Sequence, residues 1–256
     1  MRITVCELND DPLLFTRDWE ALCQHTIAMN SELVLLPEMP FYPWLASRPD
    51  FNLQAWQLAV QAHDSWLERL VELAPAWVLG TRPVERNNQR LNEAFLWHAK
   101  TGYTPVHAKH YLPQEEGFWE ASWFQRGNAD FQVADCADFK MGFTVCTELW
   151  FLEKARHYGK QGVHMLANPR ATLRSSLEKW LVGGRAAAVV SGAYVLSSNK
   201  VSLSHSSPQF GGQAWVVDPD GQVLGLTSPD SPFLTVEIDL QAAQSAKQTY
   251  PRYVEE

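Results

Sequence analysis

The segment Gly142-Phe143-Thr144-Val145-Cys146-Thr147-Glu148-Leu149-Trp150-Phe151 places a thiol between two contrasting patterns. The residues before Cys146 are largely apolar and typical of a buried strand, whereas residues 151–160 have the pattern of a helix. A turn from strand to helix holds its side chain outward and leaves backbone N–H groups free beside it. Cys146 is therefore a candidate nucleophile, and the alternative is a buried structural cysteine.

Strand-like and helix-like patterns alternate on both sides of this turn. Strands are predicted at 2–8, 33–36, 76–81, 91–98, 103–107, 139–145, 163–167, 193–199, 213–217, 222–225 and 233–238, and helices at 15–29, 51–73, 151–160 and 175–191. We find no linker, low-complexity tract or short-period repeat between them. The pattern favours one α/β domain over residues 1–256, built from two sheets that are covered by helices.

Composition limits the partners that this chain can take. The 256 residues are 46% hydrophobic and carry a net charge of −8, which argues against nucleic acid and anionic membranes as partners. Residues 1–6 do not resemble a signal peptide, and no apolar run reaches the length of a transmembrane helix. The four cysteines form no C-x-x-C pair, so we expect reduced thiols and a cytoplasmic location.

Two other short apolar segments also end in polar residues. Glu38 follows the predicted strand at 33–36, and Lys109 follows the one at 103–107. In open α/β sheets, sites gather beyond the carboxyl ends of strands, so these side chains and Cys146 are expected to converge. An ammonium lowers the pKa of a thiol and neutralises an oxyanion, while a carboxylate accepts and returns the proton. This set can attack an amide or nitrile carbon.

These segments belong to longer blocks that lie in a recognisable order. Leu35-Leu36-Pro37-Glu38, Lys109-His110-Tyr111-Leu112-Pro113 and the block from Cys146 to Arg156 resemble the nitrilase superfamily, the carbon–nitrogen hydrolases. They are similar to its L-P-E, K-x-H-L-P and C-W-D-x-x-F-P-E-x-A-R blocks, the last from the amidase and carbamoylase branches. The resemblance covers nearly the whole chain, and the later residues that fit it are Trp180, Arg185, Asn199, Phe210-Gly211-Gly212 and the run 217–221.

The resemblance implies a fold and a set of roles. The fold is the four-layer α-β-β-α sandwich of the superfamily. Members of the family commonly form oligomers, which implies at least a homodimer. Cys146 is implied as the nucleophile and Glu38 as the base, while Lys109 and the Thr147 backbone N–H stabilise the oxyanion. A second glutamate that holds the lysine matches Glu120 best, with Glu115 and Glu116 as rivals.

The implied activity is hydrolysis of a non-peptide C–N bond in a small linear amide or N-carbamoyl compound. A cysteine thioester is the intermediate, ammonia or an amine is released, and neither a metal nor a cofactor takes part. The candidate substrate-binding residues are Thr147, Trp119, Glu116, Asn168 and Ala171. The acidic and aromatic segment 109–127 suits a substrate with an apolar or cationic tail.

Several alternatives remain open from the sequence. Glu148 follows the pattern of true nitrilases, so hydrolysis of a nitrile to acid and ammonia is an alternative, although a role in supporting the turn is expected for this residue. Transfer of the acyl group to another amine is a third reaction. A catalytically silent member that binds a partner or metabolite is the alternative from another class. His107 and His110 have the spacing H-x-x-H, but no third metal ligand is evident.

Overall fold

The computed structural model describes residues 1–73, 76–203 and 206–254. The predicted domain of 1–256 also includes residues 74–75, 204–205 and 255–256, which lie outside the described residues. Every predicted site residue falls within the described ranges. No helix in these ranges combines the length and the apolar character needed to cross a membrane.

The described strands form two sheets that share strand β1 (Arg2–Asn9). The first sheet adds β2 (Leu33–Leu35), β3 (Trp77–Arg86), β4 (Gln89–His98), β5 (Gly102–Ala108) and β12 (Phe233–Glu237). The second adds β6 (Ala134–Asp135), β7 (Lys140–Phe143), β8 (Met165–Arg170), β9 (Tyr194–Val201), β10 (Trp215–Val217) and β11 (Val223–Leu226).

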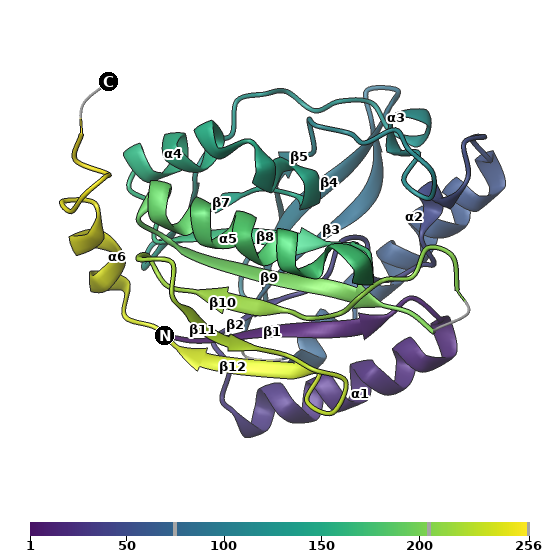
Figure 1. Cartoon of the computed structure of the whole chain (residues 1–256). Helices are drawn as coiled ribbons and strands as arrows, with labels where there is room; N and C mark the ends of the chain where they lie inside the picture. The colour runs from purple at the N-terminus through teal and green to yellow at the C-terminus, as the bar shows by residue number, and fades with distance from the viewer. Residues whose placement is uncertain (74–75, 204–205, 255–256) are drawn as a thin grey trace.

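Strand β1 joins the sheets because its two halves have different partners. Residues 2–6 pair antiparallel with β12, and residues 3–5 pair parallel with β2. The last three residues, Glu7, Leu8 and Asn9, pair instead with Asn199–Val201 of β9. Figure 1 shows β1 between these neighbours. The two sheets are therefore tied together at one corner and are free to pack face to face elsewhere.

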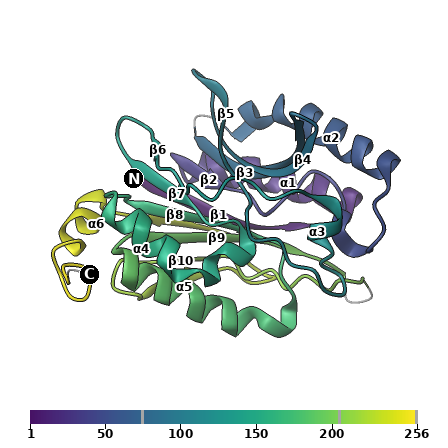
Figure 2. The ribbon, with the colours of Figure 1, turned by 90° about the horizontal axis from the view of Figure 1, so that it is seen from above.

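Helices cover the outer faces of both sheets. Helices α1 (Pro12–Ala28) and α2 (Leu53–Leu67) lie on one side, and α4 (Leu152–Lys160) and α5 (Leu177–Ser191) lie on the other, with the strands between them (Figure 2). This confirms the predicted four-layer α-β-β-α arrangement. The shorter elements are α3 (Glu120–Trp123), α6 (Leu240–Ala246) and 3-10 turns at Leu45–Ser47, Leu70–Leu73, Cys146–Trp150 and Arg174–Ser176.

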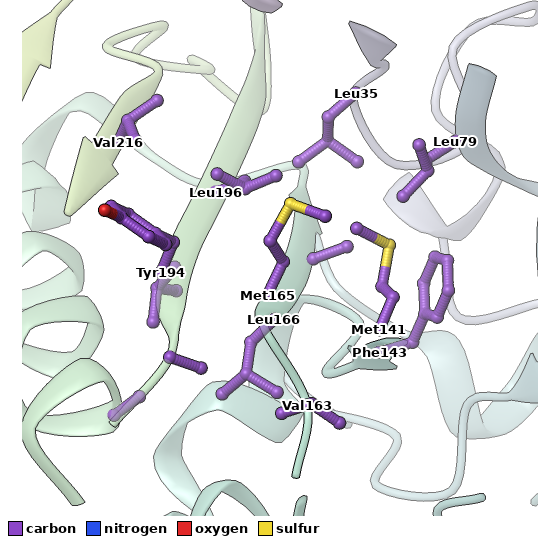
Figure 3. Close-up of a cluster of buried hydrophobic side chains, with 14 of the residues drawn as sticks. Leu35, Leu79, Met141, Phe143, Val163, Met165, Leu166, Tyr194, Leu196 and Val216 are labelled. Carbon is purple, nitrogen blue, oxygen red and sulfur yellow. The ribbon is translucent and has the colours of Figure 1, made fainter. Parts of the chain in front are cut away.

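The core fills the space between the sheets. Leu35 and Leu79 of the first sheet face Met141 and Met165 of the second, with Phe143 beside them (Figure 3). Alternate residues on the same strands point the other way, because successive side chains of a strand lie on opposite faces. Val34, Leu36 and Val78 thus pack in a separate cluster with Phe15 and Trp19 of α1.

Some element boundaries differ from the sequence prediction. The helix predicted at 51–73 is divided into α2 and the 3-10 turn Leu70–Leu73, whose Leu70 and Leu73 are fully buried. Their burial continues the apolar pattern past the end of the helix, which explains the overestimate. The short elements β6, α3 and α6 were not predicted, because elements of two to seven residues carry too little periodicity to be recognised.

Helices α4 and α5 approach closely at Gly159. A Cβ added there would lie 2.5 Å from the carbonyl oxygen of Ser191, which is backbone and cannot rotate away. We expect Gly159→Ala to lower the free energy of unfolding by about 1–3 kcal/mol, as overpacking does. Denaturant unfolding measures this change. The exposed substitution Glu153→Ala on the same helix should change it by less than about 0.5 kcal/mol, and equal losses would contradict the close packing.

Candidate active site

Cys146 lies where β7 gives way to a 3-10 turn, as the strand-to-turn pattern predicts. Its backbone has a φ of +47°, in the left-handed region that non-glycine residues rarely adopt. Such a conformation costs on the order of 1–3 kcal/mol and persists only where the surroundings enforce it. Its side chain is 4% exposed. The chain therefore holds this thiol in a fixed, strained turn.

The carboxylate of Glu148 is one group that enforces the turn. It accepts hydrogen bonds from the Val145 backbone N–H at 2.8 Å and from the His110 backbone N–H at 2.7 Å. His107 Nε2 lies 2.8 Å from Oε2, the oxygen that also accepts from Val145. Glu148 is fully buried, and its partners connect the thiol turn to the segment that follows β5. It thus supports the turn through hydrogen bonds, as expected.

Asn168 supports the same turn from β8. Its side-chain amide donates to the carbonyl oxygen of Cys146 at 3.2 Å and also to that of Thr144. Asn168 is fully buried and is not among the residues that line the cavity next to Cys146. The structure therefore places this predicted substrate-binding residue behind the nucleophile turn.

Lys109, Glu38 and Glu120 form one buried cluster. Lys109 Nζ donates to Glu38 Oε1 at 2.8 Å and to both oxygens of Glu120, at 2.8 and 2.7 Å. All three side chains are essentially inaccessible to solvent. Glu38 follows β2, Lys109 follows β5 and Glu120 begins α3, so three distant segments meet here. Of the three candidates for the second glutamate, Glu120 is the one that binds Lys109.

One oxygen of Glu38 remains available. Its Oε1 accepts from both Lys109 and the Asn92 side chain, the latter at 2.8 Å. Its Oε2 is buried and has no hydrogen-bond partner among the described residues. An unpartnered carboxylate oxygen in a buried site can accept a proton from a neighbouring group. The sequence analysis missed Asn92, whose one signal is that it is polar within an apolar strand.

The cluster shifts the pKa values of its members. Burial opposes charge on Lys109, but Glu120 and Glu38 outweigh it and hold the Lys109 pKa above its ordinary value. Burial and the charge of Glu38 raise the pKa of Glu120 to about 8, against the opposing effect of Lys109. Burial, then Glu38, raises the pKa of Cys146, although Lys109 and a hydrogen bond to the Ala171 backbone lower it. The resting thiol is therefore neutral.

A cavity of about 330 Å³ opens beside the thiol. Cys146 and Glu120 form part of its wall, together with two predicted substrate-binding residues, Thr147 and Ala171. The residues that complete the wall are Pro113, Glu115, Phe118, Trp150, Thr172, Leu173, Ser176, Lys179 and Trp180. The wall of the cavity thus combines the Cys146 thiol with aromatic, aliphatic and polar side chains.

The remaining predicted substrate-binding residues lie elsewhere. Trp119 packs against the apolar cluster that contains Trp44 and Phe118, and its backbone N–H donates to Ala46 at 2.8 Å. Glu116 is exposed, and the cavity wall includes its neighbour Glu115 instead. The sequence analysis did not select Lys179, which the first turn of α5 brings to the cavity. An aromatic residue one position later, Trp180, was the only nearby signal.

Within the described ranges, no group of three or more His, Cys, Asp or Glu side chains is arranged to hold a metal ion. The pair His107 and His110 has other partners. His107 lies against Glu148, and His110 Nδ1 lies 2.6 Å from the carbonyl oxygen of Gly127. These contacts assign the H-x-x-H spacing to hydrogen bonds that brace the segment after β5.

Comparison with known proteins identifies the family of this chain. A family model for carbon-nitrogen hydrolases matches residues 11–248. The chain belongs to the carbon–nitrogen hydrolase family. The resemblance to the nitrilase superfamily is thereby confirmed. A carbon-nitrogen hydrolase from Helicobacter pylori G27 superposes with a TM-score of 0.86 at 20% identity, covering 98% of this chain and 94% of that one.

Two relatives extend the comparison within the family. An omega-amidase from Mus musculus is 29% identical over 141 residues, which are 55% of this chain and 51% of that protein. The match therefore spans about half the length of that relative. An N-carbamoylputrescine amidase from Arabidopsis thaliana is 23% identical over 90% of this chain and 83% of its own length. Both relatives are amidases by name.

The raised pKa of Glu120 predicts a pH dependence of stability. The folded chain holds this proton up to about pH 8, whereas an unfolded glutamate releases it near 4.5. The stabilising contribution is therefore fully present below about pH 4.5 and is lost as the pH rises through about 8. We expect the free energy of unfolding of the native chain to fall, relative to that of Glu120→Gln, across this range.

Urea unfolding at several pH values measures this difference. The matched control is Glu85→Gln, because Glu85 is an exposed glutamate on β3. Its difference from the native chain should stay flat over the same range. A native-minus-Glu120→Gln difference that stays flat or rises with pH would mean that Glu120 does not hold a proton in the folded state.

Proposed function

We propose that this chain hydrolyses a non-peptide C–N bond of small linear amides or N-carbamoyl compounds through a thioester on Cys146. The observation that carries the proposal is the placement of Cys146 in a cavity wall beside the buried Glu38–Lys109–Glu120 cluster. This arrangement combines a nucleophile, a cation and a carboxylate with a free oxygen. Membership of the carbon–nitrogen hydrolase family and the names of the two amidase relatives support the same reaction class.

In the first half of the reaction, Cys146 Sγ attacks the amide carbon and forms a C–S bond. Glu38 Oε2 takes the thiol proton as the bond forms, because the raised pKa of Cys146 keeps the resting thiol neutral. Lys109 and the Thr147 backbone N–H stabilise the negative charge on the carbonyl oxygen. The C–N bond then breaks, and Glu38 passes the proton to the departing ammonia or amine.

In the second half, water attacks the thioester carbon while Glu38 accepts one of its protons. The C–S bond breaks, and the proton returns to Cys146 Sγ. The sum is one amide and one water converted to a carboxylic acid and ammonia or an amine. An N-carbamoyl compound gives a carbamic acid in place of the carboxylic acid. Every group that moves a proton is a side chain of this chain, so the mechanism needs neither a metal nor a cofactor.

Glu120 acts on Lys109 in this scheme. Its two oxygens fix the position of Nζ, and its hydrogen bonds help to hold the Lys109 pKa above the ordinary value. Lys109 therefore stays cationic throughout the reaction. Glu120 also forms part of the cavity wall, where it can orient the attacking water.

The wider predictions from the sequence stand as part of this proposal. We propose one domain over residues 1–256, at least a homodimer, a cytoplasmic location and a small-molecule partner. Nitrile hydrolysis is less favoured, because the Glu148 carboxylate that suggested it is occupied by three donors behind the turn. A nitrile is nevertheless included in the experiment below, as is an alternative acceptor amine.

Replacement of the nucleophile tests the proposal. The native chain should release ammonia from butanamide or butylurea, and Cys146→Ala should reduce that rate at least about a thousandfold, because no thioester can form. Butyronitrile tests for nitrile hydrolysis, and hydroxylamine, added as an acceptor amine, tests for acyl transfer. Cys23→Ala, at a partly exposed thiol on α1, is the matched control and should keep the native rate. Equal release by native and Cys146→Ala chains, or none from any compound, would favour the silent family member.

Replacement of the cation tests the electrostatic part. Lys109→Met should lower kcat by about a hundred- to a thousandfold, as loss of one oxyanion donor does. It should also slow iodoacetamide labelling of Cys146 and move its pH midpoint upward, because Lys109 lowers the thiol pKa. Lys200→Met removes another buried lysine, paired with Asp10, and controls for lost stability. Rates are compared per folded molecule, and similar kcat losses in both variants would contradict the role of Lys109.

A further inference from the structure

Two oppositely charged side chains lie in the cavity wall in addition to Glu120. Glu115 belongs to the segment between Lys109 and α3, and Lys179 belongs to the first turn of α5. Both are exposed, and neither forms a side-chain hydrogen bond or ion pair with another described residue. The third charged residue of the wall, Glu120, is occupied by Lys109. The cavity thus offers one free anion and one free cation to a ligand.

The rest of the wall suits a short carbon chain. Phe118, Leu173, Trp150 and Trp180 supply aromatic and aliphatic surface. A volume of about 330 Å³ is at the low end of small-molecule sites, so a ligand of few atoms fills it. A ligand with its amide at Cys146 and a short methylene stem along this surface would extend toward the charged side chains.

Building on the proposed function, we infer that the substrate is an α-amino acid whose side chain ends in an amide or carbamoyl group. Its carboxylate binds Lys179, its ammonium binds Glu115, and its methylene stem lies against the aromatic wall. The free anion and cation of the cavity are then both matched by the ligand. The carbamoyl or amide carbon reaches Cys146 at the other end.

A substrate tail of one charge would match the cavity less well. A tail with only an amine would be attracted by Glu115 but repelled by Lys179. A tail with only a carboxylate would be attracted by Lys179 but repelled by Glu115. A neutral tail would use neither side chain. The sequence analysis expected an apolar or cationic tail, and the cationic option relied in part on Glu116, which lies outside the cavity wall. Inclusion of Lys179 makes a zwitterionic tail the better match.

Four matched amides separate these possibilities. L-glutamine carries both charges, glutaramate lacks the ammonium, 4-aminobutanamide lacks the carboxylate, and butanamide lacks both. We expect Lys179→Met to raise KM about three- to tenfold for L-glutamine and glutaramate, and Glu115→Gln to do so for L-glutamine and 4-aminobutanamide. Neither variant should change KM for butanamide. Added salt should weaken L-glutamine use more than butanamide use.

Neighbouring charges provide the controls. Glu178→Gln changes the residue next to Lys179, and Lys100→Met removes an exposed lysine in the turn between β4 and β5; neither residue lines the cavity. Both variants should keep the native KM for all four amides. The inference is overturned if Lys179→Met and Glu115→Gln leave every KM unchanged. It is also overturned if they change all four equally, as they would if the two side chains only paired with each other.

Binding measurements separate this inference from the proposed chemistry. Calorimetry on Cys146→Ala reports the affinity of the four amides without any turnover. The inference stands if L-glutamine binds more tightly than butanamide and if Lys179→Met and Glu115→Gln each weaken the binding of L-glutamine. This holds even where Cys146-dependent hydrolysis is absent. If hydrolysis depends on Cys146 but affinity does not follow the charges, the proposed function stands and the inference fails.

Discussion

The contact between Lys109 and two buried carboxylates is the constraint on which the site depends. A charge removed from water is costly, and loss of one partner of a buried pair typically costs about 3–5 kcal/mol, because the other charge is left without compensation. Glu38, Lys109 and Glu120 come from the ends of β2 and β5 and from the start of α3. Their mutual dependence therefore holds three separate segments of the chain together.

A second constraint acts on the nucleophile itself. The left-handed backbone of Cys146 is unfavourable, and the surrounding hydrogen bonds oppose its relaxation. Glu148 holds the N-terminal side of the turn through Val145, and Asn168 holds the carbonyl of Cys146. Glu148 also binds the backbone of His110, one residue after Lys109. The strained turn and the ion cluster are thus connected by a single buried carboxylate, so the thiol keeps its position relative to the cation.

The layers of the fold and the meeting of Glu38, Lys109 and Glu120 were predictable from the sequence for identifiable reasons. Strands such as 33–36 alternate between two buried faces, and Glu38 and Lys109 stand at the ends of such strands. Family blocks then selected Glu120 over Glu115 and Glu116. The wall of the cavity was less predictable, because the path of segment 109–127 depends on long-range contacts such as the one between Trp119 and Ala46.

Lys179 and Asn92 show that a sequence pattern does not reveal contacts between distant segments. Lys179 is one exposed lysine in an amphipathic pattern, and only the packing of α5 beside the thiol turn gives it a place at the cavity. Asn92 is similar, since its contact with Glu38 crosses 54 positions of sequence. Periodicity reports which face of an element is buried. It does not report which distant loop contacts that face, and ligand recognition depends on such contacts.

The proton balance of the site connects its stability to its reactivity. Lys109 contributes one positive charge and the two carboxylates contribute two negative charges, so one shared proton makes the buried group neutral. The raised pKa of Glu120 assigns that proton to Glu120 below about pH 8, while Glu38 Oε2 has no hydrogen-bond partner among the described residues. Burial, and then the charge of Glu38, disfavours a thiolate at Cys146, so the resting thiol keeps its proton. In the proposed mechanism, attack on a substrate avoids a buried thiolate, because the negative charge moves to the carbonyl oxygen as the proton reaches Glu38. The raised pKa of Cys146 is therefore compatible with the proposed reaction, in which the thiol loses its proton only as the C–S bond forms.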